Sequence, residues 1–427
     1  MSNRTRAALF VLAFSLAAQT DNSKQAIRTL KDIGKRGNSA HIRSVEPYLR
    51  DQNVEVRREA VIALTRIGGL ESLGHLATAT TDGDEEVQIR ATDGIVNFYL
   101  PGYVEFGLGA SLKRAGGALK GKFTETNDQV IPSYIEVKPE VAQALGALAK
   151  NGASVQSKAN AARALGILRA RPAVPDLLEA IQTKKSEILY EALVALQKIG
   201  DPSAADGIAF LMRDLDPKIQ IAAIEATGQL RNESAGPRLR QVLGDSKNAK
   251  VRRAALIALA KLPHPDNRPV FEQFILDREE GLRAASAEGF ARLKDPKDLE
   301  RINKLFAEEK KMEANLSLAF AAVMLGNREL SEFSPLQYLI NTLNSVAWRG
   351  VAHPFLAELC RDEETRKALY PAMYQRNKEE KVALADILAR TYADDVRPSL
   401  ETLSRDGETE VAQAGARALR TLNAAAR

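Results

Sequence analysis

The sequence predicts an all-α solenoid, because one helical pattern returns along the chain at a nearly constant spacing. Its clearest copy spans residues 251–262, where Val251, Ala255, Leu259 and Leu262 lie at i, i+4, i+8 and i+11. This spacing places all four side chains on one stripe of an α-helix. Hydrophobic residues make up 45% of the chain but aromatic residues only 5%, which suits closely packed helices better than sheets.

The same stripe can be followed through the chain from a reference position, which is Leu259 in the clearest copy. Most intervals between equivalent positions are 31 to 34 residues, and the positions are Leu30, Leu64, Ile95, Leu165, Leu196, Thr227, Leu259, Phe290, Ala322, Leu356, Leu388 and Leu419. A small residue stands four positions earlier in most copies, namely Ala26, Ala60, Ala91, Ala161, Ala192, Ala223, Ala255, Ser286, Ala352 and Gly415. Small side chains let neighbouring helices approach closely.

A second helix is predicted in each unit from apolar residues 12, 15 and 16 positions after the reference. Examples are Leu177, Ala180 and Ile181, and in later units Leu239, Val242 and Leu243. The pairs Asp201-Pro202 and Asp295-Pro296 place Asp at the N-cap and Pro at the first position of a second helix, and Asp216-Pro217 does the same at a first helix. A pair of antiparallel helices cannot bury both apolar faces alone, so we expect the pairs to stack.

Residues 251–262 and 195–201 resemble the HEAT repeat, and most closely the short bacterial form called the phycobilisome-lyase HEAT-like repeat. The resemblance extends over about residues 22–427. It implies a right-handed α-solenoid of about eleven and a half two-helix repeats, which acts in most such proteins as a binding scaffold and in a few as an enzyme. The pattern is less regular between Ala322 and Leu388, where Pro354 predicts a kink or a displaced repeat.

Residues 1–18 are predicted to be a signal peptide. Arg4 and Arg6 precede an apolar run at 7–18, and small residues stand before Gln19. The alternative is a buried first helix of a cytosolic solenoid, although the run has no polar face. Twelve apolar residues are too few to cross a bilayer, which takes about 20. We therefore expect a mature solenoid from residue 19 to 427 that is periplasmic or secreted and has no transmembrane span.

One repeat is interrupted by an insertion. The interval from Ile95 to Leu165 is 70 residues, so 39 residues are in excess of one 31-residue period, and they map to about residues 100–138 within the third repeat. The insertion carries four cations with no acidic residue among them: Lys113, Arg114, Lys120 and Lys122. These cations are expected either to form a solvated loop or to contact anionic lipid or another acidic surface.

The motifs that would indicate catalysis are incomplete. Residues 116–122 match the start of a phosphate-binding P-loop, but Phe123 stands where Ser or Thr must hold magnesium. The four histidines lie in different repeats and none is followed by Glu, whereas HEAT-type deoxyhypusine hydroxylases, which resemble this array, bind iron through His-Glu pairs. No metal or other cofactor is therefore predicted.

The single cysteine, Cys360, lies at helical spacing from apolar neighbours. We expect it to pack inertly in the core. The alternative is a catalytic thiol that is activated by His353, which would lie two turns away on the same helix.

The charge distribution favours protein partners over nucleic acid. The net charge is +5, and acidic and basic residues are interleaved throughout, which argues against a dedicated nucleic-acid binder. The second helices are expected to line the concave surface, with exposed positions that include Glu179, Gln273, Arg238, Gln241, Arg301 and Lys304. The predicted partner-binding residues are Arg238, Gln241, Arg301 and Lys304, together with the insertion cations Lys113, Arg114, Lys120 and Lys122.

The resulting hypothesis is an exported, non-catalytic scaffold that binds protein partners. Two alternatives stay open. The first is an enzyme such as a phycobilin lyase, for which the resemblance supplies no catalytic signature to test. The second is a membrane-surface adaptor that works through the basic insertion.

Overall fold

The computed structural model describes residues 22–104, 129–132 and 134–425, and every regular element in these ranges is a helix. The all-α solenoid predicted from the repeat pattern is confirmed. The chain divides into two compact units, which are unit 1 (residues 1–131 and 135–204) and unit 2 (residues 132–134 and 205–427). The predicted signal peptide and the four insertion cations Lys113, Arg114, Lys120 and Lys122 lie outside the described residues.

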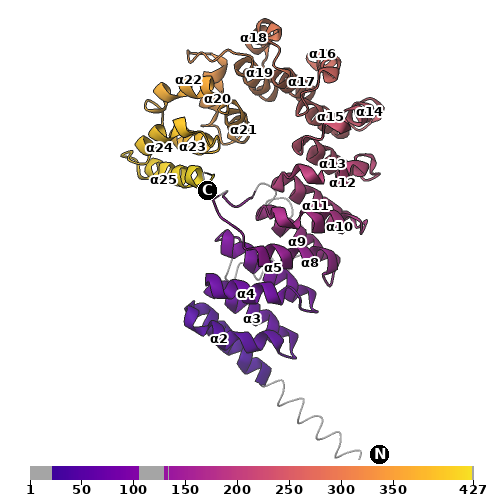
Figure 1. The fold of residues 1–427 in the computed structure, drawn as a ribbon, viewed down its shortest axis with the longest axis vertical. Coiled ribbons are helices and arrows are strands. Elements are labelled where there is room, and N and C mark those ends of the chain that lie inside the picture. Colours follow the sequence, from indigo (N-terminus) through magenta and orange to yellow (C-terminus); the bar gives the residue numbers. More distant parts are fainter. Residues whose placement is uncertain (1–21, 105–128, 133, 426–427) are drawn as a thin grey trace, which may run out of the picture. The chain divides into compact units, whose positions relative to one another are not determined.

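Unit 1 begins with helical residues 22–36 and continues as alternating first and second helices (Figure 1). The first helices that follow are α3 (Val54–Ile67), α5 (Glu85–Tyr99), α9 (Val155–Ile167) and α11 (Ser186–Ile199). The second helices are α2 (Ile42–Val45), α4 (Gly69–Ala79), α8 (Pro139–Asn151) and α10 (Val174–Ile181). Short 3-10 turns, such as η2 (Glu46–Arg50) and η3 (Arg171–Ala173), flank several of them.

Unit 2 continues the same alternation. Its first helices are α13 (Pro217–Gln229), α15 (Ala249–Ala260), α17 (Glu280–Leu293), α19 (Met312–Met324), α21 (Arg349–Leu359), α23 (Lys378–Ala389) and α25 (Thr409–Ala425). Its second helices are α12 (Ala205–Ile208), α14 (Gly236–Asp245), α16 (Arg268–Phe274), α18 (Leu299–Glu308), α20 (Pro335–Thr342), α22 (Glu363–Met373) and α24 (Arg397–Leu403). The irregular stretch contains two helices with internal prolines, Pro354 in α21 and Pro371 in α22.

In unit 2 the first helices form the inner side of a curved row. Figure 1 shows α15, α17 and α19 on the inner side and α14, α16 and α18 on the outer side. The expectation that second helices line the concave surface is therefore wrong for this unit. Hydrophobic periodicity identifies the buried face of each helix, but it does not say which helix of a pair faces the inside of the curve.

The reference stripe forms the core. All reference residues from Leu30 to Leu388 are buried, and only Leu419, in the last helix, is half-buried. Consecutive first helices pack directly on one another, for example α9 on α11 and α13 on α15. A Cβ atom added at Gly166 would lie 2.7 Å from the Cα atom of Ala195, a separation too short for carbon atoms. Glycine thus permits the close approach of α9 and α11.

The Asp-Pro pairs cap helices as predicted, with one refinement. Asp216 accepts a hydrogen bond from the backbone N–H of Lys218 (2.9 Å) and begins α13 directly. Asp295 accepts from the backbone N–H of Lys297 (3.1 Å), but the element it caps is the 3-10 turn η8 (Pro296–Asp298), which leads into α18.

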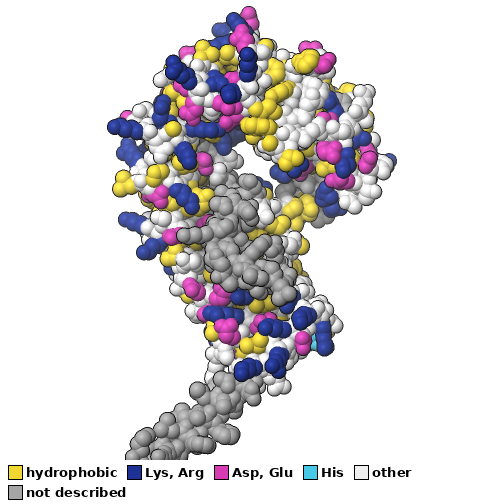
Figure 2. Space-filling model, turned by 180° about the vertical axis from the view of Figure 1, so that it is seen from behind, with side chains coloured by type: hydrophobic (Ala, Val, Ile, Leu, Met, Phe, Trp, Pro, Cys, Tyr) yellow, Lys and Arg dark blue, Asp and Glu magenta, His cyan; other side chains and the backbone are white. Residues whose placement is uncertain are grey.

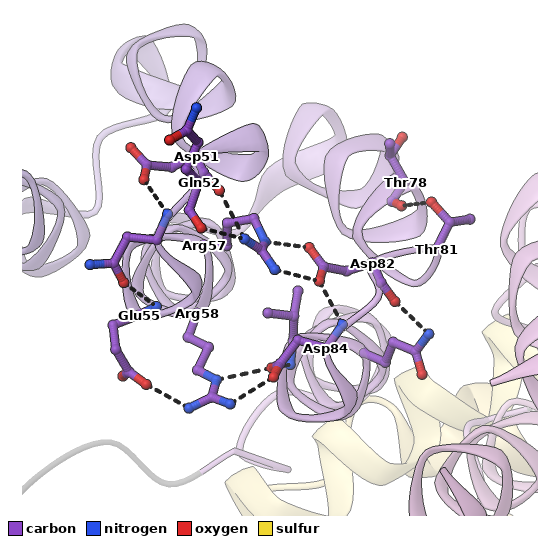
Figure 3. A network of polar contacts seen from close by, with 12 residues as sticks. Asp51, Gln52, Glu55, Arg57, Arg58, Thr78, Thr81, Asp82 and Asp84 are labelled. Carbon is purple, nitrogen blue, oxygen red and sulfur yellow. Dashed lines mark hydrogen bonds and ion pairs between the residues drawn. The ribbon is translucent and has the colours of Figure 1, made fainter. Parts of the chain in front are cut away.

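A carboxylate in the turn before a first helix links that helix to the preceding repeat (Figure 3). Asp82 Oδ1 accepts a hydrogen bond from the backbone N–H of Asp84 (2.8 Å), which orders the turn before α5. The same carboxylate accepts hydrogen bonds from Nε (2.7 Å) and Nη2 (3.1 Å) of Arg57 on α3. Arg57 Nη1 also donates to the backbone carbonyl of Asp51 (2.8 Å). One guanidinium therefore connects two successive turns.

The same linkage recurs in unit 2. Glu309 accepts from the backbone N–H of Lys311 (2.9 Å) and pairs with Arg283 Nε (2.7 Å). Asp406 accepts from the backbone N–H of Glu408 (3.0 Å) and pairs with Lys381 Nζ (2.8 Å). At these three places a charge-assisted hydrogen bond of defined geometry joins one repeat to the next.

The predicted insertion precedes helix α8, which packs against the second helices α4 and α10 and against the first helix α9. Its assignment to the interior of the third repeat stays a prediction.

The small-residue column is testable by enlargement of one side chain. Ala255 is 0% exposed, so Ala255→Leu should overpack α15 against its neighbours and lower the free energy of unfolding by about 1–3 kcal/mol. Urea denaturation followed by circular dichroism measures the change. Ala249→Leu, at the exposed start of the same helix, serves as the control. Equal stability of both variants would contradict the assigned packing.

Removal of the linking carboxylate should cost more than removal of a turn carboxylate alone. Asp82→Ala loses both the turn hydrogen bond and the Arg57 ion pair, and we expect a loss of about 2 kcal/mol. Asp51→Ala is the matched control, because Asp51 Oδ1 accepts only the backbone N–H of Asn53 (2.7 Å) in the described structure, and its loss should be about 1 kcal/mol. Thermal and urea melts of the two variants compare them directly.

Candidate functional site

The predicted partner-binding residues that lie outside the insertion are on second helices of unit 2. Arg238 and Gln241 are on α14, and Arg301 and Lys304 are on α18, both on the outer side of the row (Figure 1). Gln241 Oε1 accepts a hydrogen bond from Arg213 (2.7 Å), and the Arg301 guanidinium lies 5.7 Å from the ring centroid of Phe290. None of the four predicted residues lines the pocket described below.

The two described ends of the insertion are anchored on first helices of unit 1. Asn97 Oδ1 on α5 accepts the backbone N–H of Val104 (3.0 Å) at the entry. At the exit, the backbone N–H of Ile131 donates to the carbonyl of Ile167 at the end of α9 (2.9 Å). Lys198 Nζ on α11 donates to the carbonyl of Gln129 (3.2 Å). These ends therefore lie against the C-terminal turns of the first helices.

Tyr103, at the insertion's entry, lies beside a polar cluster of the same helices. Asn160 Nδ2 donates to Asp93 Oδ1 (3.1 Å), and the buried Arg163 Nε donates to the buried Glu191 Oε2 (3.1 Å). Burial raises the pKa of Tyr103, the charge of Asp93 raises it further, and Arg163 opposes both. In unit 1, Tyr103 at the entry of the insertion thus lies beside polar side chains of the first helices.

In unit 2 cations gather at the C-terminal ends of the first helices. Because these helices stack side by side in the same direction, their last turns share one edge of the row. Positive charge is favoured there by the helix dipole. Arg231 (φ 54°) and Lys294 (φ 55°) take the left-handed conformation in the turns that follow α13 and α17.

These helix ends enclose a pocket of about 610 Å³. It is lined by Arg231, Lys261, Pro263, Arg292, Lys294, Val323, Met324, Arg328, Glu358, Leu359, Arg361, Asp362 and Thr365. Six of these side chains are basic and two are acidic. All of them belong to unit 2. Their convergence from α13 to the start of α22 makes this pocket the candidate site.

Arg292 is fixed in the wall of the pocket by two carboxylates. Its Nη1 lies 2.9 Å from Glu288 Oε2, and its Nη2 lies 2.9 Å from Glu358 Oε2. Its guanidinium also lies 5.1 Å from the ring centroid of Phe320. Burial acts to lower the pKa of Arg292, but the hydrogen bond with Glu358 and the charges of both carboxylates raise it overall.

The pKa of Glu358 is lowered by several cations of the pocket. Burial acts to raise its pKa, but the hydrogen bond and the charge of Arg292, followed by the charges of Arg231 and Arg361, lower it overall. Arg231 and Arg361 are therefore close enough to Glu358 to act on it, although they come from different repeats.

The remaining cations divide into paired and unpaired groups. Arg328 Nη2 lies 3.0 Å from Asp362 Oδ2. Lys261 Nζ donates to the neutral Oε1 of Gln229 (3.0 Å), and burial lowers its pKa against the opposing charge of Glu288. In the part of the chain that the structure describes, Arg231, Lys294 and Arg361 form no ion pair with a carboxylate.

Cys360 and His353 have separate environments. Cys360 is 0% exposed, and burial raises the pKa of its thiol to about 12. His353 Nε2 lies 3.0 Å from Asp386 Oδ2 on α23. Within residues 22–104, 129–132 and 134–425, no group of three or more His, Cys, Asp or Glu is placed to hold a metal ion. None of the helices described has the length and apolarity needed to cross a membrane.

Part of this pocket has a signal in the sequence. A basic residue stands two positions after the reference residue in several repeats: Arg66, Lys198, Lys261, Arg292 and Arg390. Over the face shown in Figure 2, Lys and Arg side chains are interspersed with Asp and Glu. Composition therefore conceals the local excess of cations in the pocket.

The match to a protein family agrees with this architecture. The model for HEAT repeats matches residues 12–95, 141–210, 207–291 and 241–315, and no curated protein sequence matches significantly. Among solved structures, the complex of CpcE and CpcF of phycocyanin lyase from a Nostoc species is 15% identical, covers 60% of this chain and 96% of its own, and has a TM-score of 0.36. Importin beta is 14% identical, covers 99% of this chain and 66% of its own, and has a TM-score of 0.39. Because the HEAT-repeat matches cover more than half of its residues, the chain belongs to the HEAT repeat family.

Proposed function

We propose that this protein is a non-catalytic scaffold that binds an acidic segment of a protein partner in the pocket of unit 2. The observation that carries the proposal is a set of cations around one concavity that form no ion pair with a carboxylate among the described residues, namely Arg231, Lys294 and Arg361. Uncompensated charge of one sign in a concave surface attracts ligands of the opposite sign and sets specificity.

The stacked helices support this proposal by holding the cations in place before a partner arrives. Arg292 is fixed by Glu288 and Glu358, and Arg328 is fixed by Asp362. A preorganised surface loses little conformational entropy on binding. The paired cations thus shape the pocket, while the unpaired ones supply charge complementarity.

The alternatives have less support from the described residues. An adaptor that contacts membranes through Lys113, Arg114, Lys120 and Lys122 depends on residues outside the described ranges. A thiol-dependent enzyme would need an accessible thiolate, whereas Cys360 is buried. The structural similarity to a phycocyanin lyase complex is too distant to assign a reaction to this chain.

The inner and outer cations can be compared by affinity capture of the native partner from the envelope fraction. Neutralisation of the inner set by Arg231→Gln, Lys294→Gln and Arg361→Gln should reduce the captured partner by about tenfold, because long-range attraction to an acidic segment is lost. Added salt should weaken capture by the wild type in the same direction.

The matched comparison neutralises the outer set by Arg238→Gln, Arg301→Gln and Lys304→Gln. This variant should capture the partner as the wild type does. If the outer variant captured less of the partner than the inner variant, recognition would belong to the second helices and the proposal would be refuted.

Cys360 should be unreactive in the folded protein. With a pKa raised to about 12 by burial, the thiol holds almost no thiolate at pH 8, and the reactive form is the thiolate. A chromogenic disulfide reagent should label it only after urea unfolding. Rapid labelling of the native protein would reopen the thiol-enzyme alternative.

Export is part of the proposed function and rests on Arg4, Arg6 and the apolar run at 7–18. Mass spectrometry of the native protein should find a new N-terminus near residue 18 or 19 in the periplasmic or secreted fraction. A cytosolic protein that retains residues 1–17 would contradict export while leaving the binding proposal intact.

A further inference from the structure

We infer that the pocket of unit 2 is a subsite for closely spaced oxyanions on a peptide, either neighbouring Asp and Glu carboxylates or a phosphorylated side chain, with Lys261 as its specificity-determining residue. This inference rests on the proposed function and names the chemistry of the ligand. Carboxylates and phosphoryl groups share the feature the pocket requires, which is two or more negative charges within a short distance.

The number of unneutralised cations indicates a multiply charged ligand. The two acidic side chains in the lining are already used, Glu358 by Arg292 and Asp362 by Arg328. Lys261, Arg231, Lys294 and Arg361 remain, and none of these four forms an ion pair with any of the residues that the structure describes. A single carboxylate would neutralise only one of them, whereas a cluster of oxyanions can contact several at once.

These cations line the same pocket although they come from different repeats. Arg231 follows α13 and Arg361 follows α21, yet the charges of both act on Glu358. Lys261 follows α15 and is influenced by both Glu288 and Arg292. The cations therefore do not form a long basic stripe, which would favour an extended polyanion. They surround a compact volume of about 610 Å³, which is the size of a typical small-ligand site.

Lys261 is distinct because its side-chain partner is neutral. The residue as a whole is half-buried, and its ammonium group donates to the amide oxygen of Gln229 (3.0 Å) in an exposed hydrogen bond. The charges of Glu288, Glu225 and Glu358 act on it, but none of these carboxylates forms an ion pair with it in the described structure. A partly buried charge without a counter-ion is unfavourable, and an anion placed beside it restores favourable electrostatics. Burial already lowers the pKa of Lys261. A ligand oxyanion that reaches this position would gain more than one bound to the exposed rim.

The shape of the pocket favours a peptide over a bilayer. Pro263, Val323, Met324 and Leu359 also line the pocket, and apolar lining strengthens the interaction of charges beside it. A flat membrane surface cannot bring its head groups to Lys261 inside a concavity, whereas a peptide side chain can. A membrane is accordingly an outcome of the test, not part of the inference.

The test measures binding of fluorescent peptides to the full chain by anisotropy. The first peptide carries four consecutive glutamates between Gly-Ser flanks, the second replaces them with glutamines, and the third replaces two of them with phosphoserines. Inorganic pyrophosphate as a competitor and vesicles with anionic lipid complete the set. We expect both anionic peptides to bind at least tenfold more tightly than the glutamine peptide. The stronger of the two identifies whether carboxylates or phosphoryl groups are preferred.

The variants assign the binding to the pocket. Lys261→Met removes a partly buried charge, so it should preserve folding, and it should weaken both anionic peptides about tenfold. Lys261→Arg should restore most of the affinity. Arg361→Gln, at an exposed position, provides a second variant with little risk to the fold. The matched control combines Lys247→Gln, Lys250→Gln and Lys310→Gln, which neutralises three exposed cations away from the pocket lining and should leave binding unchanged.

Several results would overturn the inference. The first is that the glutamine peptide binds as tightly as the anionic peptides. The second is that the protein binds the vesicles or pyrophosphate but neither anionic peptide. The third is that the control variant at Lys247, Lys250 and Lys310 loses as much affinity as the Lys261→Met variant. The two proposals can fail separately. If the peptides do not bind but capture of the native partner still depends on Arg231, Lys294 and Arg361, the scaffold proposal stands and the inferred class of ligand is wrong. If capture is also independent of these residues, both proposals fall.

Discussion

A carboxylate in the turn between repeats is the constraint on which the rest of this structure depends. Asp82 shows it most fully, because one carboxylate orders the turn before α5 and also receives Arg57 from the preceding first helix. Glu309 and Asp406 repeat the arrangement in unit 2. Apolar stripes alone would let neighbouring helices slide along their common axis, since hydrophobic contact has no preferred direction. Charge-assisted hydrogen bonds of defined geometry remove that freedom.

Fixed stacking has a direct electrostatic consequence. First helices that run in the same direction bring their C-terminal turns to one edge, and cations there stabilise each helix individually. At the pocket, six basic side chains meet two acidic ones, and within the described part of the chain Arg231, Lys294 and Arg361 form no ion pair. The cations that stabilise the end of each helix therefore also form the proposed binding surface. In unit 1 the corresponding helix ends contact the chain itself, through Tyr103 and Ile131 of the insertion.

The fold was predictable to the level of individual helices, but the candidate site was not. The reference stripe and the Asp-Pro caps identified the first helices within a few residues, because helix periodicity and capping are local properties. The partner-binding prediction chose Arg238, Gln241, Arg301 and Lys304 on second helices, which lie on the outer side of unit 2. Both helices of a pair present a polar face, and only the packing of successive pairs decides which face curves inward.

The sequence by itself determined the repeat, the two-helix unit and the core burial of Leu259 and its equivalents. These features follow from interactions between residues close in the chain, or from a period that recurs. Only the tertiary structure decided that Arg231, Lys261 and Arg361 share one pocket. Their convergence depends on the displacement accumulated over several stacked repeats, and that displacement is set by contacts between repeats, which no local pattern encodes.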